Sequence, residues 1–185
     1  NELPFPIENE ILKIGIDFNV MNCNAAICVT AGDKLYVIDE VTKQKDTDAL
    51  ATEIKRRYPF NKILVYPDAS GAARSTINAS KTDIAILQSY GFTNMALRSN
   101  PPIKDRVQTL QALLENSKGR VRLAIHASCR RLIECLELQS YDEKTGDPDK
   151  QNNYDHLNDA LGYLCYREFN MIYSRAGNKT GIKIY

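Results

Sequence analysis

Two aspartates follow short apolar runs that have the length and composition of strands. Asp17 ends the run 11–17, two residues after Gly15, and Asp68 follows the run 62–66. Strands disfavour Asp, and a nearby glycine lets another backbone or a ligand come close. The carboxyl ends of strands are also where open α/β sheets bind ligands. For each aspartate, a turn former at the end of a strand is the alternative interpretation.

A third aspartate lies in a segment with helical periodicity, 155–169. The leucines of this segment form one apolar stripe, and a second face on the other side of the helix carries Asp155, Asp159, Gly162 and Tyr166. Glycine and tyrosine are costly choices for a solvent-exposed helix surface. This second face is therefore expected to pack closely or to serve a site, and a solvated helix face is the alternative.

The three aspartates could form one site. If the run 11–17 lies centrally and pairs in parallel with 62–66, Asp17 and Asp68 meet at one end of the sheet, and the helix 155–169 can bring Asp159 there. Clustered carboxylates repel one another unless cations neutralise them. Hard oxygen ligands suit Mg²⁺ or Mn²⁺, and two such ions can clamp the attacking and leaving oxygens of a phosphodiester displacement.

The elements that must position these residues begin with a meander. Three strand-like runs, 11–17, 25–30 and 34–41, follow one another, and a tight-turn signal separates the last two. A helix over 46–57 has acidic residues first and basic residues last, the order that the helix dipole favours. The run 62–66 is then reached through that helix, which favours a parallel strand.

Helices and strands then alternate. The patterns predict a helix over 82–90, a strand near 94–97, a helix that starts after the prolines 101–102, a strand over 121–125, and helices over 128–138 and 155–169. This order predicts an α/β domain in which a mixed central sheet, a three-strand meander plus parallel strands, is flanked by helices on both faces.

Eight short stretches add specificity because they occur in a fixed order over residues 11–169. They are 15–17 (GID), 66–71 (YPDASG), 105–107 (DRV), 122–129 (RLAIHASC), 131–133 (RLI), Glu137, 141–143 (YDE) and 156–160 (HLNDA). Each is weak alone. As an ordered series they resemble the ribonuclease H-like superfamily, and more specifically the nuclease domain of the terminase large subunit of tailed phages.

The resemblance implies a metal-dependent endonuclease that cuts concatemeric double-stranded viral DNA during genome packaging. It implies Asp17, Asp68 and Asp159 as catalytic ligands of two Mg²⁺ or Mn²⁺ ions, with His156 beside them as a further ligand or proton carrier. By chemistry alone, His156 could equally bond backbone at a helix start, and Asp155 could be a helix cap or an extra ligand. Replacing Asp68 or Asp159 by Asn is expected to abolish cutting, preserve the fold and raise its stability by relieving repulsion.

The charge distribution offers candidates for DNA binding. The segment 98–131 has eight basic and two acidic residues, a net charge of +6, whereas the rest of the chain has 16 basic and 21 acidic residues, a net charge of −5. A local basic stretch can bind a polyanion, although a solvated helix face is the alternative. The candidates for phosphate contact are Lys104, Arg106, Arg120, Arg122, Arg130 and Arg131. Arg106 and Arg131 could instead pair with Glu115 or Glu134.

The expected domain organisation is a linker over 1–10, a nuclease domain over 11–170 and a tail over 171–185. Within the domain, the polar segment 139–153 matches the position of an auxiliary hairpin in the family, and its acidity suggests that it restricts access of DNA to the site. The family also implies an ATPase motor domain in the same subunit, a portal protein and a small terminase subunit as partners. No GxxxxGK[ST] loop is present, so the chain is expected to be an isolated nuclease portion without ATP hydrolysis.

Composition restricts the class of protein and the compartment. The 185 residues include 24 Lys and Arg against 23 Asp and Glu, with 43% hydrophobic residues, which is typical of one globular domain. Five cysteines without a CxxC pair fit neither a disulfide framework nor a zinc site, and predict buried, reduced thiols. With no apolar run long enough for a bilayer, we expect no membrane association and a location in the host cytoplasm.

Three other functions are compatible with these residues. A resolvase, a transposase or a ribonuclease H would use the same metal chemistry on a different nucleic acid. A non-catalytic module could bind DNA or a portal protein through the same surface. A small-molecule α/β enzyme could use the loop after Asp68, although the lone Gly71 is too little for a nucleotide fingerprint.

Overall fold

The described residues form one six-stranded sheet with the order β5-β4-β1-β2-β3-β6. A computed structural model describes residues 6–19, 21–72, 82–143, 145–150 and 152–169, so the predicted tail lies outside it. The strands are β1 (Leu12–Asp17), β2 (Cys23–Ala31), β3 (Lys34–Gln44), β4 (Ile63–Pro67), β5 (Thr93–Asn94) and β6 (Leu123–Ile125). β1, β2 and β3 pair antiparallel, and the other pairings are parallel. The prediction of a mixed sheet with a meander is confirmed.

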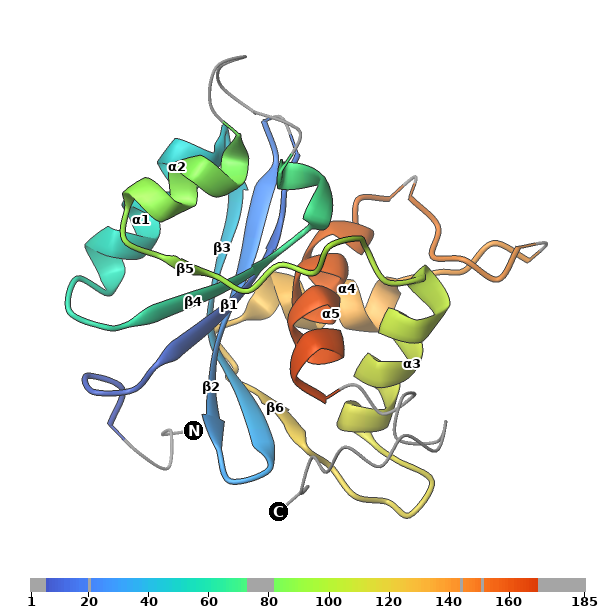
Figure 1. Cartoon of the computed structure of the whole chain (residues 1–185). Coiled ribbons are helices and arrows are strands. Elements are labelled where there is room, and N and C mark those ends of the chain that lie inside the picture. Colours follow the sequence, from blue (N-terminus) through green and yellow to red (C-terminus); the bar gives the residue numbers. More distant parts are fainter. Residues whose placement is uncertain (1–5, 20, 73–81, 144, 151, 170–185) are drawn as a thin grey trace.

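Helices cover both faces of this sheet (Figure 1). They are α1 (Thr47–Arg57), α2 (Asp83–Ser89), α3 (Ile103–Leu114), α4 (Arg130–Leu138) and α5 (Asp155–Phe169), with a short 3₁₀ helix, η1 (Ala69–Ala72), after β4. The side chains of Asp46 and Thr82 cap α1 and α2 by accepting hydrogen bonds from Ala49 N and Ala85 N. Such caps satisfy backbone N–H groups that have no partner inside the helix.

Two hydrophobic cores hold the layers together. One core joins the sheet to α1 and α2, and the other joins it to α3, α4 and α5. β1 contributes to the first core through Leu12, Ile14 and Ile16, which alternate along the strand and are fully buried. All five cysteines are buried, as predicted, and none is paired with another.

Some elements differ from their predicted bounds. β5 has only two residues instead of the predicted 94–97, and α4 begins at Arg130 because residues 126–129 form a turn that Cys129 N closes on His126 O. β2 and β3 are both longer than predicted, and η1 was not predicted. Short edge strands and turns depend on tertiary contacts, which a local sequence pattern does not report.

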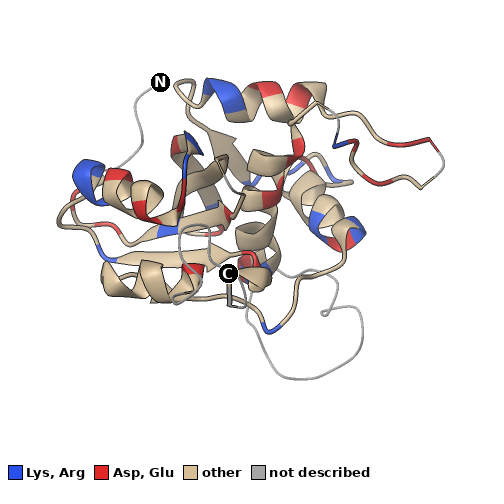
Figure 2. Cartoon of the chain, turned by 90° about the horizontal axis from the view of Figure 1, so that it is seen from above, with Lys and Arg blue, Asp and Glu red and all other residues tan. Residues whose placement is uncertain are grey.

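The segment 139–153 connects α4 to α5 and projects from the body of the molecule (Figure 2). Tyr141 and Pro148 form an isolated antiparallel bridge, and Gly146 has a left-handed backbone, with φ of 72°. Asp142 N also donates to Asp147 O. The described charged residues of this segment are mostly acidic, and they appear red in Figure 2. Its predicted role in restricting access to the site stays a prediction.

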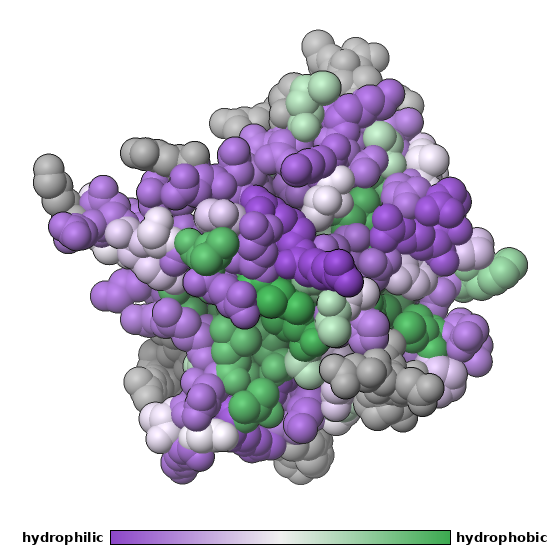
Figure 3. Space-filling model, turned by 180° about the vertical axis from the view of Figure 1, so that it is seen from behind, coloured by the Kyte–Doolittle hydropathy of each residue, from purple (hydrophilic) through white to green (hydrophobic). Residues whose placement is uncertain are grey.

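The side opposite to the view of Figure 1 is mostly hydrophilic, with a hydrophobic area near the centre and smaller hydrophobic spots around it (Figure 3). Large hydrophobic residues that stay exposed, such as Phe60 and Met21, are scattered over the described part of the chain. Among the described residues, no helix has both the length and the apolar character that a bilayer crossing requires.

Candidate functional site

Sheet topology brings Asp17 and Asp68 to the same end of neighbouring strands. β1 and β4 run parallel, with Ile16 opposite Pro67. Asp17 directly follows Ile16, and Asp68 directly follows Pro67. Asp68 N donates to Ile16 O over 3.1 Å, which fixes the two strand ends side by side. The predicted parallel pairing of these strands is therefore confirmed, and it positions both aspartates at the carboxyl ends of the two strands.

Helix α5 packs on β1, and it lies beside the sheet in Figure 1. A Cβ atom added at Gly15 would lie 2.0 Å from Ala160 O, so only glycine lets the strand and the helix backbones approach this closely. The sequence predicted such an approach near Gly15. This packing brings the first turns of α5, with Asp155, His156 and Asp159, to the end of β1 where Asp17 lies.

His156 contacts Asp17 directly. Its Nδ1 lies 3.0 Å from Asp17 Oδ2 and 3.0 Å from Asn19 Nδ2. A protonated Nδ1 donates to Asp17, whereas an unprotonated Nδ1 accepts from Asn19, so the protonation state selects the partner. The hydrogen bond to Asp17 raises the pKa of His156, the carboxylates of Asp155, Asp17 and Asp159 raise it further, and burial opposes them. His156 therefore contacts side chains, and the alternative of a histidine that bonds only the backbone does not hold.

Asp159 lies one turn along α5 and forms an ion pair with Arg106 of α3, with Oδ1 2.6 Å from Nη1. Arg106 also lies over the ring of Tyr163, 4.4 Å from its centroid. Burial raises the pKa of Asp159, and the charges of Asp17 and Asp155 raise it further, which outweighs the lowering by Arg106. The predicted second face of α5 is thus a packed face that meets α3.

Asp68 is oriented by two hydrogen bonds. Its Oδ1 accepts from Ser70 N over 2.7 Å and from Asn100 Nδ2 over 2.6 Å. Asn100 Oδ1 in turn accepts from Ala69 N over 2.8 Å, so this amide links the loop before α3 to the loop after β4. Sequence reasoning missed Asn100, and its position directly before two prolines was the available signal of a fixed loop.

The donor set fits a hard divalent ion in its chemistry. Asp155 is buried, and its Oδ1 has no hydrogen-bond partner in the described structure, although His156 Nε2 lies 3.9 Å away. A buried carboxylate oxygen without a partner is costly unless a cation binds near it. As the side chains stand, no three His, Cys, Asp or Glu residues of the described chain are close enough to hold one ion.

The basic candidates differ in burial and in their distance from the acidic site. Arg106 and Arg122 are buried, with exposed fractions of 5% and 7%, so their prediction as phosphate contacts is corrected: buried guanidinium groups cannot reach a DNA backbone. Arg122 and Arg120 also lie at the opposite end of the sheet, because Leu123 pairs with Leu35 near the start of β3, and Arg120 forms an ion pair with Asp33.

The remaining basic candidates are accessible. Lys104 and Arg130 are exposed, and Arg131 is partly exposed and pairs with Glu134, its Nη1 lying 2.6 Å from Oε2. Seen from above, Lys and Arg residues occur on several separate elements (Figure 2). The role of Lys104, Arg130 and Arg131 in phosphate contact stays a prediction.

A mixed sheet of this order, with helices on both faces, is the fold expected of a ribonuclease H-like domain, and the family model agrees. A family model described as the terminase RNaseH-like domain matches residues 14–168. The chain belongs to this family. A comparison with curated proteins finds no match.

Solved structures share the fold. The large terminase of a thermophilic bacteriophage has a TM-score of 0.65 and 18% identity, over 89% of this chain and 41% of that one. The P22 large terminase nuclease domain also has a TM-score of 0.65 and 18% identity, over 87% of this chain and 82% of that one. The nuclease domain of the large terminase g2p from bacteriophage SPP1, with bound Mn, has a TM-score of 0.54 and 18% identity, over 85% of this chain and 86% of that one.

Proposed function

We propose that this domain is a divalent-metal-dependent endonuclease that cuts concatemeric double-stranded viral DNA during genome packaging. The contact between His156 and Asp17 carries the proposal, because it joins α5 to the end of β1 beside Asp68. Membership of the terminase family supports it, as does the Mn bound to the similarly folded SPP1 domain. Concentrated carboxylates with one imidazole suit Mg²⁺ or Mn²⁺.

Two of the acidic side chains of the proposed site, Asp17 and Asp68, are oriented by neighbouring groups. Asp17, Asp68 and Asp159 would hold two ions, with Asp155 as an extra ligand; the bound ions would supply the charge that activates water and stabilises the leaving oxygen. His156 orients the carboxylate of Asp17 through Nδ1. Asn100 and the backbone of Ser70 orient Asp68. Such second partners fix the direction in which a ligand oxygen points.

The wider context is part of the same proposal. The chain spans 41% of the length of the large terminase from the thermophilic phage, and one structure of that protein is a complex with ADP. We infer that an ATPase motor domain of the same subunit, a portal protein and a small terminase subunit are partners, and that the domain acts in the cytoplasm of the infected host cell.

Nicking of supercoiled plasmid in Mn²⁺ tests the site. Asp17→Asn and Asp68→Asn are expected to abolish nicking and to keep duplex binding, because each removes a ligand charge without changing side-chain size. Asp33→Asn is the matched control, since Asp33 lies in the β2–β3 turn at the other end of the sheet and pairs with Arg120. Wild-type nicking rates in the Asp17 and Asp68 variants would refute the assignment.

The choice of substrate tests the role in packaging. We expect the wild-type domain to cut linear duplex DNA in preference to a four-way junction or an RNA/DNA hybrid, because a packaging nuclease acts on duplex. A preference for the junction would indicate a resolvase, and a preference for the hybrid a ribonuclease H. Duplex binding without cutting in either metal would indicate a non-catalytic module.

A further inference from the structure

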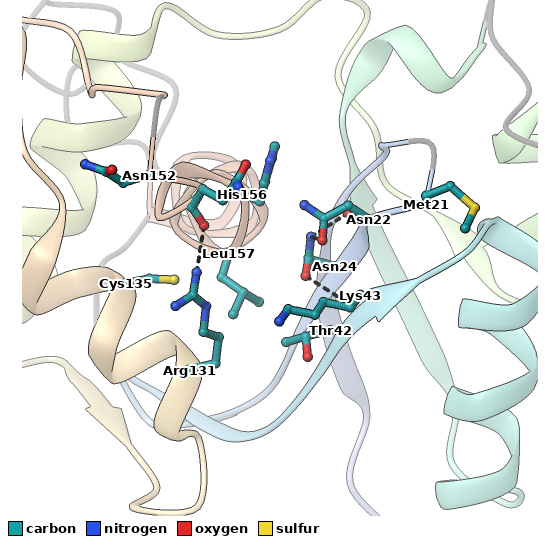
Figure 4. A pocket seen from close by; sticks show the side chains of 11 residues that line it. Met21, Asn22, Asn24, Thr42, Lys43, Arg131, Cys135, Asn152, His156 and Leu157 are labelled. Atoms are coloured by element: carbon teal, nitrogen blue, oxygen red, sulfur yellow. Dashed lines mark hydrogen bonds between the residues drawn. The ribbon is translucent and has the colours of Figure 1, made fainter.

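A pocket of about 320 Å³ lies next to the acidic site, between the ends of β2 and β3 and the helices α4 and α5. His156 belongs to both places, because its ring lines the pocket while its Nδ1 contacts Asp17. The other lining residues used below are Asn22, Asn24, Lys43, Arg131 and Asn153. Figure 4 shows the side chains of Asn22, Asn24, Lys43 and Arg131 around the space between α5 and the end of β3.

The backbone around this pocket is strained. Among the described residues, three that are not glycine have positive φ: Met21 at 61°, Lys43 at 54° and Asn153 at 54°. All three line this pocket. The left-handed region is unfavourable for Met21 and Lys43, whereas asparagine tolerates it, and such conformations cluster where function requires a fixed geometry. The coincidence of three in one pocket points to a ligand site.

Asn24 holds the strained segments in place. The register between β2 and β3 shifts between Cys23 and Ala25, so Asn24 stands at an irregularity in the ladder. Its side chain is buried, donates to Asn22 O over 2.6 Å and accepts from Lys43 N over 3.2 Å. Bulges next to sites redirect side chains. Here the irregularity, held by the hydrogen bond from Lys43 N to Asn24, places Lys43 at the pocket.

The charge of the pocket is positive. Lys43 and Arg131 project into it from opposite sides, from β3 and α4 (Figure 4). Arg131 is fixed by Glu134 and by Asn153 O, which accepts from its Nη2 over 3.0 Å. Lys43 forms no ion pair with a described residue, and none of the described lining residues is acidic. Amide side chains supply further donors.

We propose that this pocket binds a backbone phosphate of the DNA strand that runs into the acidic site, with Lys43 as the main charge. The inference rests on the proposed function and names a subsite for its substrate. Lysine, arginine and asparagine side chains and backbone N–H groups are the usual phosphate donors in protein–DNA contacts. The acidic site next to it would repel the same backbone, so a cationic pocket beside it fixes where the strand enters.

Duplex binding without cleavage tests the subsite. Fluorescence anisotropy with a fluorescein-labelled duplex in Ca²⁺, repeated over a series of KCl concentrations, gives the slope of log K against log [KCl]. Lys43→Asn removes the charge and keeps a residue that tolerates the left-handed region. It is expected to weaken binding severalfold and to reduce the slope by about 0.9, the loss of one phosphate contact. Lys43→Arg is expected to keep the slope.

Lys34→Asn is the matched control, because Lys34 starts the strand that Lys43 nearly ends and is equally a lysine on β3. An unchanged affinity and slope in Lys43→Asn, an equal loss in Lys34→Asn, or no duplex binding by the wild type would overturn the proposal. Cutting in Mn²⁺ is measured separately. If the wild type cuts DNA but Lys43→Asn does not change DNA binding, only the subsite is refuted. If binding depends on Lys43 but the wild type does not cut, only the nuclease function is refuted.

Discussion

Arg106 and Asp159 form a largely buried ion pair that joins α3 to α5 beside Asp17. Nη1 and Oδ1 are 2.6 Å apart, and the exposed fractions of the two side chains are 6% and 20%. From the sequence, Asp159 was expected to experience mainly repulsion from other carboxylates. The structure adds a cation to this environment, and the pKa of Asp159 is still raised, because burial and the neighbouring carboxylates outweigh Arg106.

The ion pair reverses one expectation about stability. Asp159→Asn leaves a buried guanidinium without its charged partner, so we expect the free energy of unfolding to fall by about 2 kcal/mol, less than the 3–5 kcal/mol of a fully buried pair because Asp159 keeps some exposure. Urea denaturation measures this change. Asp68→Asn is the control and is expected to change stability by less than about 1 kcal/mol, since only hydrogen bonds are altered. A stabilised Asp159→Asn variant would contradict the prediction.

Arg106 competes with a metal ion for Asp159. Arg106→Gln removes the competing charge, so we expect Mn²⁺ to bind about tenfold more tightly, which corresponds to about 1.4 kcal/mol. Isothermal titration calorimetry on the metal-free domain measures this affinity independently of cutting. Arg120→Gln serves as a control, because Arg120 pairs with Asp33 at the other end of the sheet. Weaker Mn²⁺ binding in Arg106→Gln, with the fold intact by circular dichroism, would show that Arg106 positions Asp159 for the ion instead.

The buried thiols predict slow alkylation and a loss of stability in alkali. Burial raises the pKa of Cys23 and of Cys135 to about 11. Because these pKa values are above those of the unfolded chain, the stabilisation is complete below the unfolded thiol pKa and is lost as the pH rises through about 11. We expect iodoacetamide to label no cysteine quickly at pH 8 in the native domain and all five in urea. Rapid native labelling of Cys135 would contradict its burial.

The strands and helices that carry strong periodicity were predictable. Asp17 and Asp68 could be brought together from sequence because a crossover helix forces parallel pairing, and parallel strands place their carboxyl ends at one edge. The close approach at Gly15 was also predictable, since a glycine inside a strand has a cost that a packing contact can repay. These inferences use only local pattern and chain topology.

Side-chain partners were not predictable in the same way. Arg106 has the sequence context of an exposed helical arginine, and only the packing of α3 on α5 buries it against Asp159 and Tyr163. Lys43 has no sequence signal, because its position depends on a register irregularity in which Thr42 and Lys43 of β3 stand opposite the single residue Asn24 of β2. Asn24 carried no such signal either, because it lies just before the predicted run 25–30, and only the structure shows that β2 begins at Cys23.

Gly15 of β1, which faces α5, and Gly162 of α5, which faces α3, provide a paired test of how the site is assembled. Gly15→Ala places a Cβ 2.0 Å from Ala160 O, and neither backbone can move without separating α5 from β1. We expect a loss of about 3 kcal/mol in unfolding free energy, near the upper end of the usual cost of overpacking. Because α5 carries His156 and Asp159, the same displacement is expected to lower nicking in Mn²⁺ even at temperatures where the variant is folded.

Gly162→Ala is the matched variant on the facing helix. Its Cβ would lie 3.6 Å from Arg106 Cβ, an ordinary contact, and alanine favours helix over glycine by up to about 1 kcal/mol. We therefore expect equal or higher stability and wild-type nicking, measured by urea denaturation and by the plasmid assay. If Gly15→Ala were as stable and as active as Gly162→Ala, the close contact of β1 with α5 could not be what holds His156 against Asp17.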